Sequence, residues 1–195
     1  MIWIGKTLSI KTRKVGYWVN KRVLLLSGSP RQNGNSEILC QQFAKGAEEA
    51  GHQVELVRVH DLQIGACRAC YGCRATKACV QKDDMTALLE KLIAADVIVL
   101  ATPVYFYTMD GQMKTMIDRT LPRYTEIADK EFYFIATAAD GKETMERTMD
   151  GLYGFIDCLP GAKVKGKIYG AGVYQKGEAT ATKAMEQAYQ YGKQC

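Results

Sequence analysis

The stretch from Val23 to Ser36, which reads VLLLSGSPRQNGNS, constrains the fold more than any other part of the chain. Four apolar residues, Val23 to Leu26, precede a polar segment of turn-forming residues that contains a single cation, Arg31. Apolar residues then recur at helical spacing, at Leu39, Phe43, Ala47 and Ala50. The stretch predicts a strand, a loop and a helix, in which backbone N–H groups of the loop and of the helix N-terminus can bind an anion.

The composition of this loop narrows the kind of anion. A Walker A loop has its two glycines one residue closer together than Gly28 and Gly34 are. It also has a lysine directly after the second glycine, where this chain has Asn35. The pyrophosphate pattern G-x-G-x-x-G does not fit either. The donors are mostly neutral, at Ser29, Asn33, Asn35 and Ser36, which suits a terminal monophosphate bound without a metal ion. The alternative is an ordinary strand-to-helix turn with Ser36 as the N-cap.

Further strands and helices alternate along the chain. Apolar runs predict strands at 53–59, 97–101, 131–138 and about 165–173. Helical spacing predicts helices that start at Asp83 or Asp84, that contain 113–121 and 145–156, and that end with one at about 179–191 closed by Gly192 at C′. Five strands alternating with five helices predict an α/β fold, a doubly wound parallel sheet with helices on both faces. Ligands bind such sheets at the carboxyl ends of the strands, which points to loops 27–36, 102–107 and 137–141.

Three motifs in this order resemble the NADPH-dependent FMN reductase branch of the flavodoxin-like superfamily. They are S-G-S-P-R-x-x-G-N-S at 27–36, P-V-Y-F at 103–106 and K-x-x-x-D-R at 114–119, and the resemblance covers roughly 22–195. It implies a flavodoxin-like sheet with strand order 2-1-3-4-5 and FMN as cofactor. By resemblance the FMN phosphate is held by Ser27, Ser29, Arg31, Asn35 and Ser36. By resemblance the flavin ring is contacted by Pro103, Val104, Tyr105 and Phe106 and, on its other side, by Thr137, Ala138, Ala139 and Gly141.

The same resemblance implies an FMN-dependent oxidoreductase. It would take electrons from NAD(P)H and pass them to a flavin, a quinone, a nitro or azo compound, or a metal centre. Flavin N5 accepts the hydride itself, so no catalytic acid or base is expected. By analogy with relatives we expect a homodimer or homotetramer. Two alternatives remain: a non-enzymatic electron-transfer protein, and a redox sensor built on the cysteines.

Four of the seven cysteines fall within 13 residues, at Cys67, Cys70, Cys73 and Cys79. Such crowding indicates a reducing, cytoplasmic compartment rather than a disulfide framework. The spacing C-x2-C-x2-C-x5-C is typical of a [4Fe–4S] cluster, whereas structural zinc usually takes two CxxC pairs set further apart. The spacing resembles the iron–sulfur flavoproteins, in which these four thiolates would be the ligands. Free or redox-active thiols and a zinc site remain alternatives.

The net charge of +5 is concentrated at the N-terminus. Residues 1–22 hold six cations and no acid, and the remaining 20 basic and 21 acidic residues give a net charge of −1. We therefore expect no nucleic-acid face on the domain at 23–195. No run approaches the roughly 18 apolar residues of a membrane span. Residues 1–22 are interpreted as a basic extension, a faint transit-peptide pattern or an arm that contacts a neighbouring subunit.

Overall fold

A computed structural model describes residues 20–195, so the predictions made for residues 1–19 lie outside it. Five parallel strands form one sheet in the order β2-β1-β3-β5-β6. Their bounds are β1 Arg22–Ser27, β2 Gln53–Arg58, β3 Val97–Tyr105, β5 Glu131–Thr137 and β6 Lys163–Gly170. Because β5 and β6 are the fourth and fifth parallel strands, the predicted order 2-1-3-4-5 is confirmed. A two-residue strand, β4 (Thr108–Met109), pairs with β3 in the antiparallel direction.

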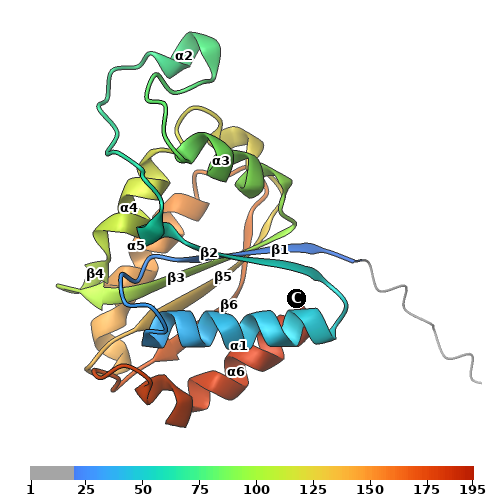
Figure 1. The fold of residues 1–195 in the computed structure, drawn as a ribbon, viewed down its shortest axis with the longest axis vertical. Coiled ribbons are helices and arrows are strands. Elements are labelled where there is room, and N and C mark those ends of the chain that lie inside the picture. The colour runs from blue at the N-terminus through green and yellow to red at the C-terminus, as the bar shows by residue number, and fades with distance from the viewer. Residues whose placement is uncertain (1–19) are drawn as a thin grey trace, which may run out of the picture.

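Helices cover both faces of this sheet (Figure 1). Helices α1 (Asn35–Glu49) and α6 (Lys183–Gln194) pack on one face. Helices α3 (Met85–Ala94), α4 (Gly111–Asp118) and α5 (Glu146–Ile156) pack on the other. Short 3-10 turns occupy Val59–Asp61, Tyr124–Glu126, Lys142–Met145 and Glu178–Ala181. A one-turn helix, α2 (Cys73–Thr76), stands apart from these layers, above α3 in Figure 1.

The continuously apolar strands supply two separate cores. Along β1, Leu24 and Leu26 pack with α3, α4 and α5, whereas Val23 and Leu25 pack with α1 and α6. The same alternation divides β3 and β5, because successive side chains of a strand point to opposite faces. This is the physical reason that the apolar runs do not alternate with polar residues. The sheet is therefore a rigid support with loops at its carboxyl edge.

The C-terminal helix corrects the prediction for Gly192. The helix does not end there: α6 runs on to Gln194, and Gly192 lies inside it. A Cβ at Gly192 would collide with the carbonyl oxygen of Phe43 on α1, and one at Gly46 would collide with the carbonyl oxygen of Tyr189 on α6. Gly192 is thus needed for the close approach of two helices. From sequence alone this requirement cannot be told from a C-cap, because both favour a glycine near the end of a helix.

Four other boundaries also differ from those predicted. Helix α4 ends at Asp118, so residues 119–121 lie outside the helix that was predicted to contain 113–121. Gly34, not Ser36, is the N-cap of α1, so the capping alternative for Ser36 is wrong. Strand β3 continues to Tyr105, because Val104 and Tyr105 pair with β4. Strand β6 ends at Gly170 instead of about 173. Among the helices of residues 20–195, none combines the length and the apolar composition that a membrane span requires.

Candidate functional site

One hollow at the carboxyl edge of the sheet brings together ten of the thirteen residues that were expected to bind the cofactor. It has a volume of about 190 Å³ and lies where the loop 27–36, the end of β3 and the end of β5 meet. The predicted residues that line it are Ser29, Arg31, Asn35, Ser36, Pro103, Val104, Tyr105, Thr137, Ala138 and Ala139. Parallel pairing places these loops together, with Ser27 opposite Ala101 and Pro103 opposite Thr137.

The 173–179 segment completes the hollow and was not foreseen. Val173 and Tyr174 line it. The Arg31 guanidinium donates from Nη1 to the Tyr174 carbonyl oxygen at 3.0 Å, which holds this cation at the rim. The one sequence feature that could have placed this segment at the site is its position directly after the fifth parallel strand. The prediction instead extended that strand to about residue 173.

Asn35 ties the first loop to that segment. Its Nδ2 donates to the Gln175 carbonyl oxygen at 2.9 Å, and its Oδ1 accepts from the backbone N–H groups of Gly177 and Ala179, both at 3.1 Å. The amide group is therefore engaged by the protein. What remains for an anion here are the backbone N–H groups of the first turn of α1, which have no intrahelical acceptor.

Hydroxyl groups gather at the base of the hollow. Ser36 Oγ and Thr137 Oγ1 are 2.7 Å apart, and Ser29 Oγ accepts from the Arg31 backbone N–H at 3.3 Å. Ser27 is fully buried, and its Oγ has no hydrogen-bond partner within the described residues. Buried hydroxyls usually have a partner. The donor set of neutral hydroxyls, free N–H groups and one cation fits a phosphate monoester.

A buried carboxylate stands behind the loop. The Glu37 side chain is 6% exposed, and its Oε2 accepts from the Asn33 backbone N–H at 2.9 Å. Arg58, the last residue of β2, lies 3.1 Å from the same oxygen through Nε and donates from Nη2 to the Pro30 carbonyl oxygen at 3.3 Å. Arg58 and Glu37 therefore fix the conformation of the loop, including Asn33 with its φ of +51°. Nothing in the sequence around Arg58 or Glu37 predicted that these two side chains pair.

Asp110 fixes the loop from its other side. Its buried carboxylate accepts from the Thr102 hydroxyl at 2.7 Å and from the Met113 N–H at 2.9 Å, which caps α4. A Cβ at Gly28 would collide with this carboxylate, so Gly28 is required for the close approach. The loop is therefore held by β2 on one side and by the start of α4 on the other.

Aromatic side chains form the rim of the hollow. Tyr105 and Tyr174 line it and are more than one-third exposed. Phe106 and Tyr107 form the turn between β3 and β4, both with positive φ, and Phe106 is 99% exposed. Phe106 does not line the hollow, and neither do Ser27 and Gly141.

The four clustered cysteines lie around a second, smaller hollow. It is lined by all four thiol-bearing residues together with Arg68 and Arg119. Within residues 20–195, no three His, Cys, Asp or Glu side chains are close enough to hold one metal ion between them. A zinc site requires all of its ligands within about 2.3 Å of one ion, whereas a cubane binds each thiolate through a different iron. Four thiols around one hollow are the donor set that a [4Fe–4S] cluster uses.

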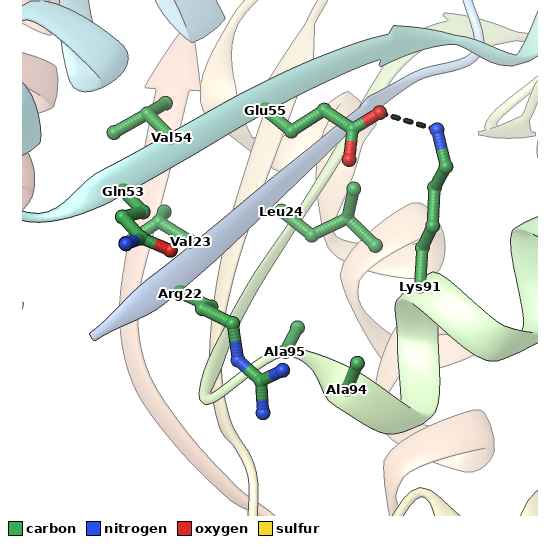
Figure 2. A pocket seen from close by; sticks show the side chains of 9 residues that line it. All are labelled: Arg22, Val23, Leu24, Gln53, Val54, Glu55, Lys91, Ala94 and Ala95. Atoms are coloured by element: carbon green, nitrogen blue, oxygen red, sulfur yellow. Dashed lines mark hydrogen bonds and ion pairs between the residues drawn. The ribbon is translucent and has the colours of Figure 1, made fainter.

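A third hollow has a volume of about 230 Å³, and Figure 2 shows the residues that line it. It lies between the amino-terminal ends of β1 and β2 and the end of α3, and the Lys91–Glu55 ion pair crosses it (Figure 2). This hollow is larger than the one described first, but it lies at the edge opposite to the one at which parallel sheets bind ligands.

Comparison with known proteins identifies relatives of this site. The family model described as NADPH-dependent FMN reductase matches residues 21–160. An "Iron-sulfur flavoprotein" of Archaeoglobus fulgidus is 41% identical over 95 residues, which are 49% of this chain and 43% of that relative. The chain therefore spans less than half the length of this relative. An "Iron-sulfur flavoprotein" of Methanosarcina thermophila is 32% identical over 134 residues, 67% of this chain and 70% of the relative.

The fold itself is shared with solved flavoprotein structures. A flavodoxin from the domain Archaea superimposes with a TM-score of 0.58 at 12% identity, over 89% of this chain and 94% of that chain. At such low identity the comparison concerns the fold alone. The α/β sheet described above is therefore flavodoxin-like.

Proposed function

Because the chain belongs to the NADPH-dependent FMN reductase family, we propose that it binds FMN in the hollow at the carboxyl edge of the sheet and transfers electrons from NAD(P)H to a second acceptor. The observation that carries this proposal is the donor set of that hollow, in which a helix N-terminus, hydroxyls and Arg31 converge. Bound FMN would supply hydride acceptance, in which a hydride brings two electrons and one proton, and would make the two electrons available to the acceptor.

The residues around the hollow have separate roles in this proposal. The first N–H groups of α1, Ser29 and Arg31 bind the phosphate. Ser27 is buried and does not line the hollow, so no phosphate contact is assigned to it. Asn35 positions the 175–179 segment through the three hydrogen bonds described above. The hollow of about 190 Å³ is smaller than the roughly 300–1,000 Å³ of most small-molecule sites. The flavin ring would therefore extend over the rim, where Tyr105 and Tyr174 lie.

The cysteine segment is proposed to hold a [4Fe–4S] cluster. Support comes from the four thiols around one hollow, from the cations Arg68 and Arg119 beside them, and from relatives named iron–sulfur flavoproteins. The cations offset the negative charge that four thiolates would bring. The cluster would supply one-electron transfer to a partner.

An absorbance spectrum of protein purified without oxygen tests both assignments. We expect flavin peaks with a broad shoulder from iron–sulfur absorption, and bleaching of the flavin when NADPH is added. Flavin peaks without that shoulder, and without bound iron, would contradict the cluster. A flavin that ferredoxin reduces but NAD(P)H does not would contradict the reductase and favour the electron-transfer alternative.

The variant Arg31→Ala tests the phosphate site. Loss of one charge-assisted contact should weaken FMN binding by about 1.5–3 kcal/mol, or roughly 10- to 150-fold. Binding of riboflavin, which has no phosphate, should change little, and both affinities can be measured by fluorescence quenching. Lys176→Ala is the matched control, since Lys176 is an exposed cation close to this loop that does not line the hollow. Unchanged FMN affinity in Arg31→Ala would place the anion site elsewhere.

A further inference from the structure

Arg119 is a buried cation far from the flavin hollow. It follows the last residue of α4, and its side chain is only 1% exposed. Burying a guanidinium without an ion-pair or hydrogen-bond partner is costly in free energy. The partners of the Arg119 side chain therefore indicate its role. All of the partners recorded for its side chain belong to the cysteine segment, residues 65–83.

The guanidinium contacts both ends of that segment. Nη1 donates to the Gly65 carbonyl oxygen at 2.6 Å, just before the first cysteine. Both carboxylate oxygens of Asp83, after the last cysteine, accept from Arg119, at 2.7 and 2.9 Å. Nη2 also lies 3.4 Å from the Cys79 sulfur, as a donor to it.

Two further hydrogen bonds connect the same two ends of the segment directly. The Gly65 N–H donates to Asp83 Oδ2 at 3.1 Å, and the Gln81 side chain donates to the Ala66 carbonyl oxygen at 3.1 Å. The ends of the segment, Gly65 and Asp83, are 18 positions apart in sequence and are thus joined side by side, with Arg119 bonded to both.

The remainder of the segment has mainly local contacts. Thr76 Oγ1 bonds only with Gly72 and Ala78, and the Arg74 guanidinium lies 4.1 Å from the centre of the Tyr71 ring. Cys67 and Cys70 are exposed, and Ala69, Tyr71 and Lys77 have positive φ. The conformation that directs four thiols to one hollow therefore depends on how the ends are held.

We propose that Arg119 is the positioning residue of the cysteine segment: it joins the two ends and holds the Cys79 sulfur at the hollow shared with the other three thiols. A second consequence rests on the proposed function. A fixed positive charge and an N–H donor at a ligand sulfur favour the more negative, reduced cluster, so Arg119 should raise the reduction potential of the cluster.

Hydrogen exchange of the purified, FMN-bound protein tests the positioning role directly. In Arg119→Met, backbone amides of residues 65–83 should exchange at least about tenfold faster than in the wild type, since local opening is no longer opposed by the buried ion pair. Arg123→Met is the control, because Arg123 lies four residues on and pairs with Glu90 and Glu126, outside the segment; the link from there to the segment is the exposed 3.9 Å pair between Glu126 and Lys77, which should contribute little. Unchanged exchange in Arg119→Met would overturn the proposal.

A conservative variant guards against a folding failure. Arg119→Lys keeps the charge but cannot bond Gly65, Asp83 and Cys79 together, because its ammonium lacks the planar fork. If Arg119→Met does not fold, faster exchange at 65–83 in Arg119→Lys supports the proposal, and wild-type exchange overturns it. The FMN content of either variant should stay that of the wild type.

The cluster provides a second readout. Iron should be lost to a chelator about 10- to 100-fold faster in Arg119→Met, the effect typical of outer-shell partners, and the reduction potential should fall. Wild-type iron loss with a wild-type potential would overturn the tuning role. If wild-type protein binds no iron, the proposed cluster fails, while the exchange measurement still decides the positioning role of Arg119.

Discussion

Arg58 shows how a single residue can position a distant loop. Arg58 ends β2, 21 positions after Glu37, yet it is the cation that pairs with this buried carboxylate next to the loop 27–36, which is proposed to bind the phosphate. A third contact, from Nη1 to Asp61 at 2.8 Å, lies at the surface and is expected to contribute little. The pair with Glu37 matters because a lone carboxylate there would be poorly solvated and close to the proposed phosphate.

Arg58→Met should therefore destabilise the protein and weaken FMN binding. Leaving Glu37 without its partner should cost about 1–3 kcal/mol in the free energy of unfolding. Urea unfolding and FMN titration measure the two effects.

The double variant Arg58→Met/Glu37→Met is the control. Removing both charges also removes the uncompensated carboxylate, so most of the lost stability should return. A double variant that is no more stable than Arg58→Met alone would show that packing of the arginine, rather than its charge, is what matters.

At the level of whole elements, the crossing of α1 and α6 determines where the 173–179 segment can lie. Gly46 and Gly192 let the two backbones touch, and α6 begins shortly after the segment that Asn35 holds. The packing of a pair of helices on one face of the sheet thus supports one wall of the candidate site.

Gly192→Ala should separate these helices. An added methyl group has no space against the backbone of Phe43, and we expect a loss of about 1–3 kcal/mol in the free energy of unfolding. Thermal and urea unfolding measure this loss.

Gly154→Ala on α5 is the matched control. No atom outside the local backbone lies within 4 Å of a Cβ at that position, so the usual helix preference should leave stability unchanged or raise it by up to about 1 kcal/mol. Equal effects of the two substitutions would contradict the close helix contact.

Much of this element-level arrangement could be predicted from sequence, but contacts between elements could not. Apolar runs and turn residues located the five parallel strands, and the rule for their carboxyl ends located the loops. Tyr174 was missed because the end of β6 depends on pairing with β5. The prediction for Gly192 was wrong because a helix C-cap and a close helix crossing both favour glycine. The pairing of Arg58 with Glu37 could not be predicted because it joins β2 to α1, and periodicity describes each element separately.

For the molecule as a whole, two carboxylates in ion pairs, Asp83 and Glu131, make stability depend on pH. The hydrogen bonds and charge of Arg119, with the Gly65 and Met85 N–H groups, hold the pKa of Asp83 below its ordinary 3.8. Burial alone would raise the pKa of Glu131, but Lys21 and Lys165 lower it below its ordinary 4.5. Both carboxylates bind protons more weakly in the folded state than in the unfolded state.

The free energy of unfolding should therefore be nearly constant above about pH 5 and should fall as pH decreases through 4.5 and 3.8 toward the lowered native pKa values. Urea unfolding between pH 7 and pH 3 measures this dependence. In Asp83→Asn/Glu131→Gln the decline between pH 5 and pH 3 should be shallower. An equally steep decline would assign acid sensitivity to other carboxylates.

The turn at Phe106 and Tyr107 has a consequence for any effort to make this protein more robust. Asn-Gly would adopt the two positive φ angles without penalty, whereas two aromatic residues hold them at a cost of roughly 1–3 kcal/mol each. A screen that selects only for heat resistance should favour replacing this pair. The resulting variant should unfold at a higher temperature, but it would lose two exposed aromatic side chains next to Tyr105, which lines the hollow proposed to bind FMN.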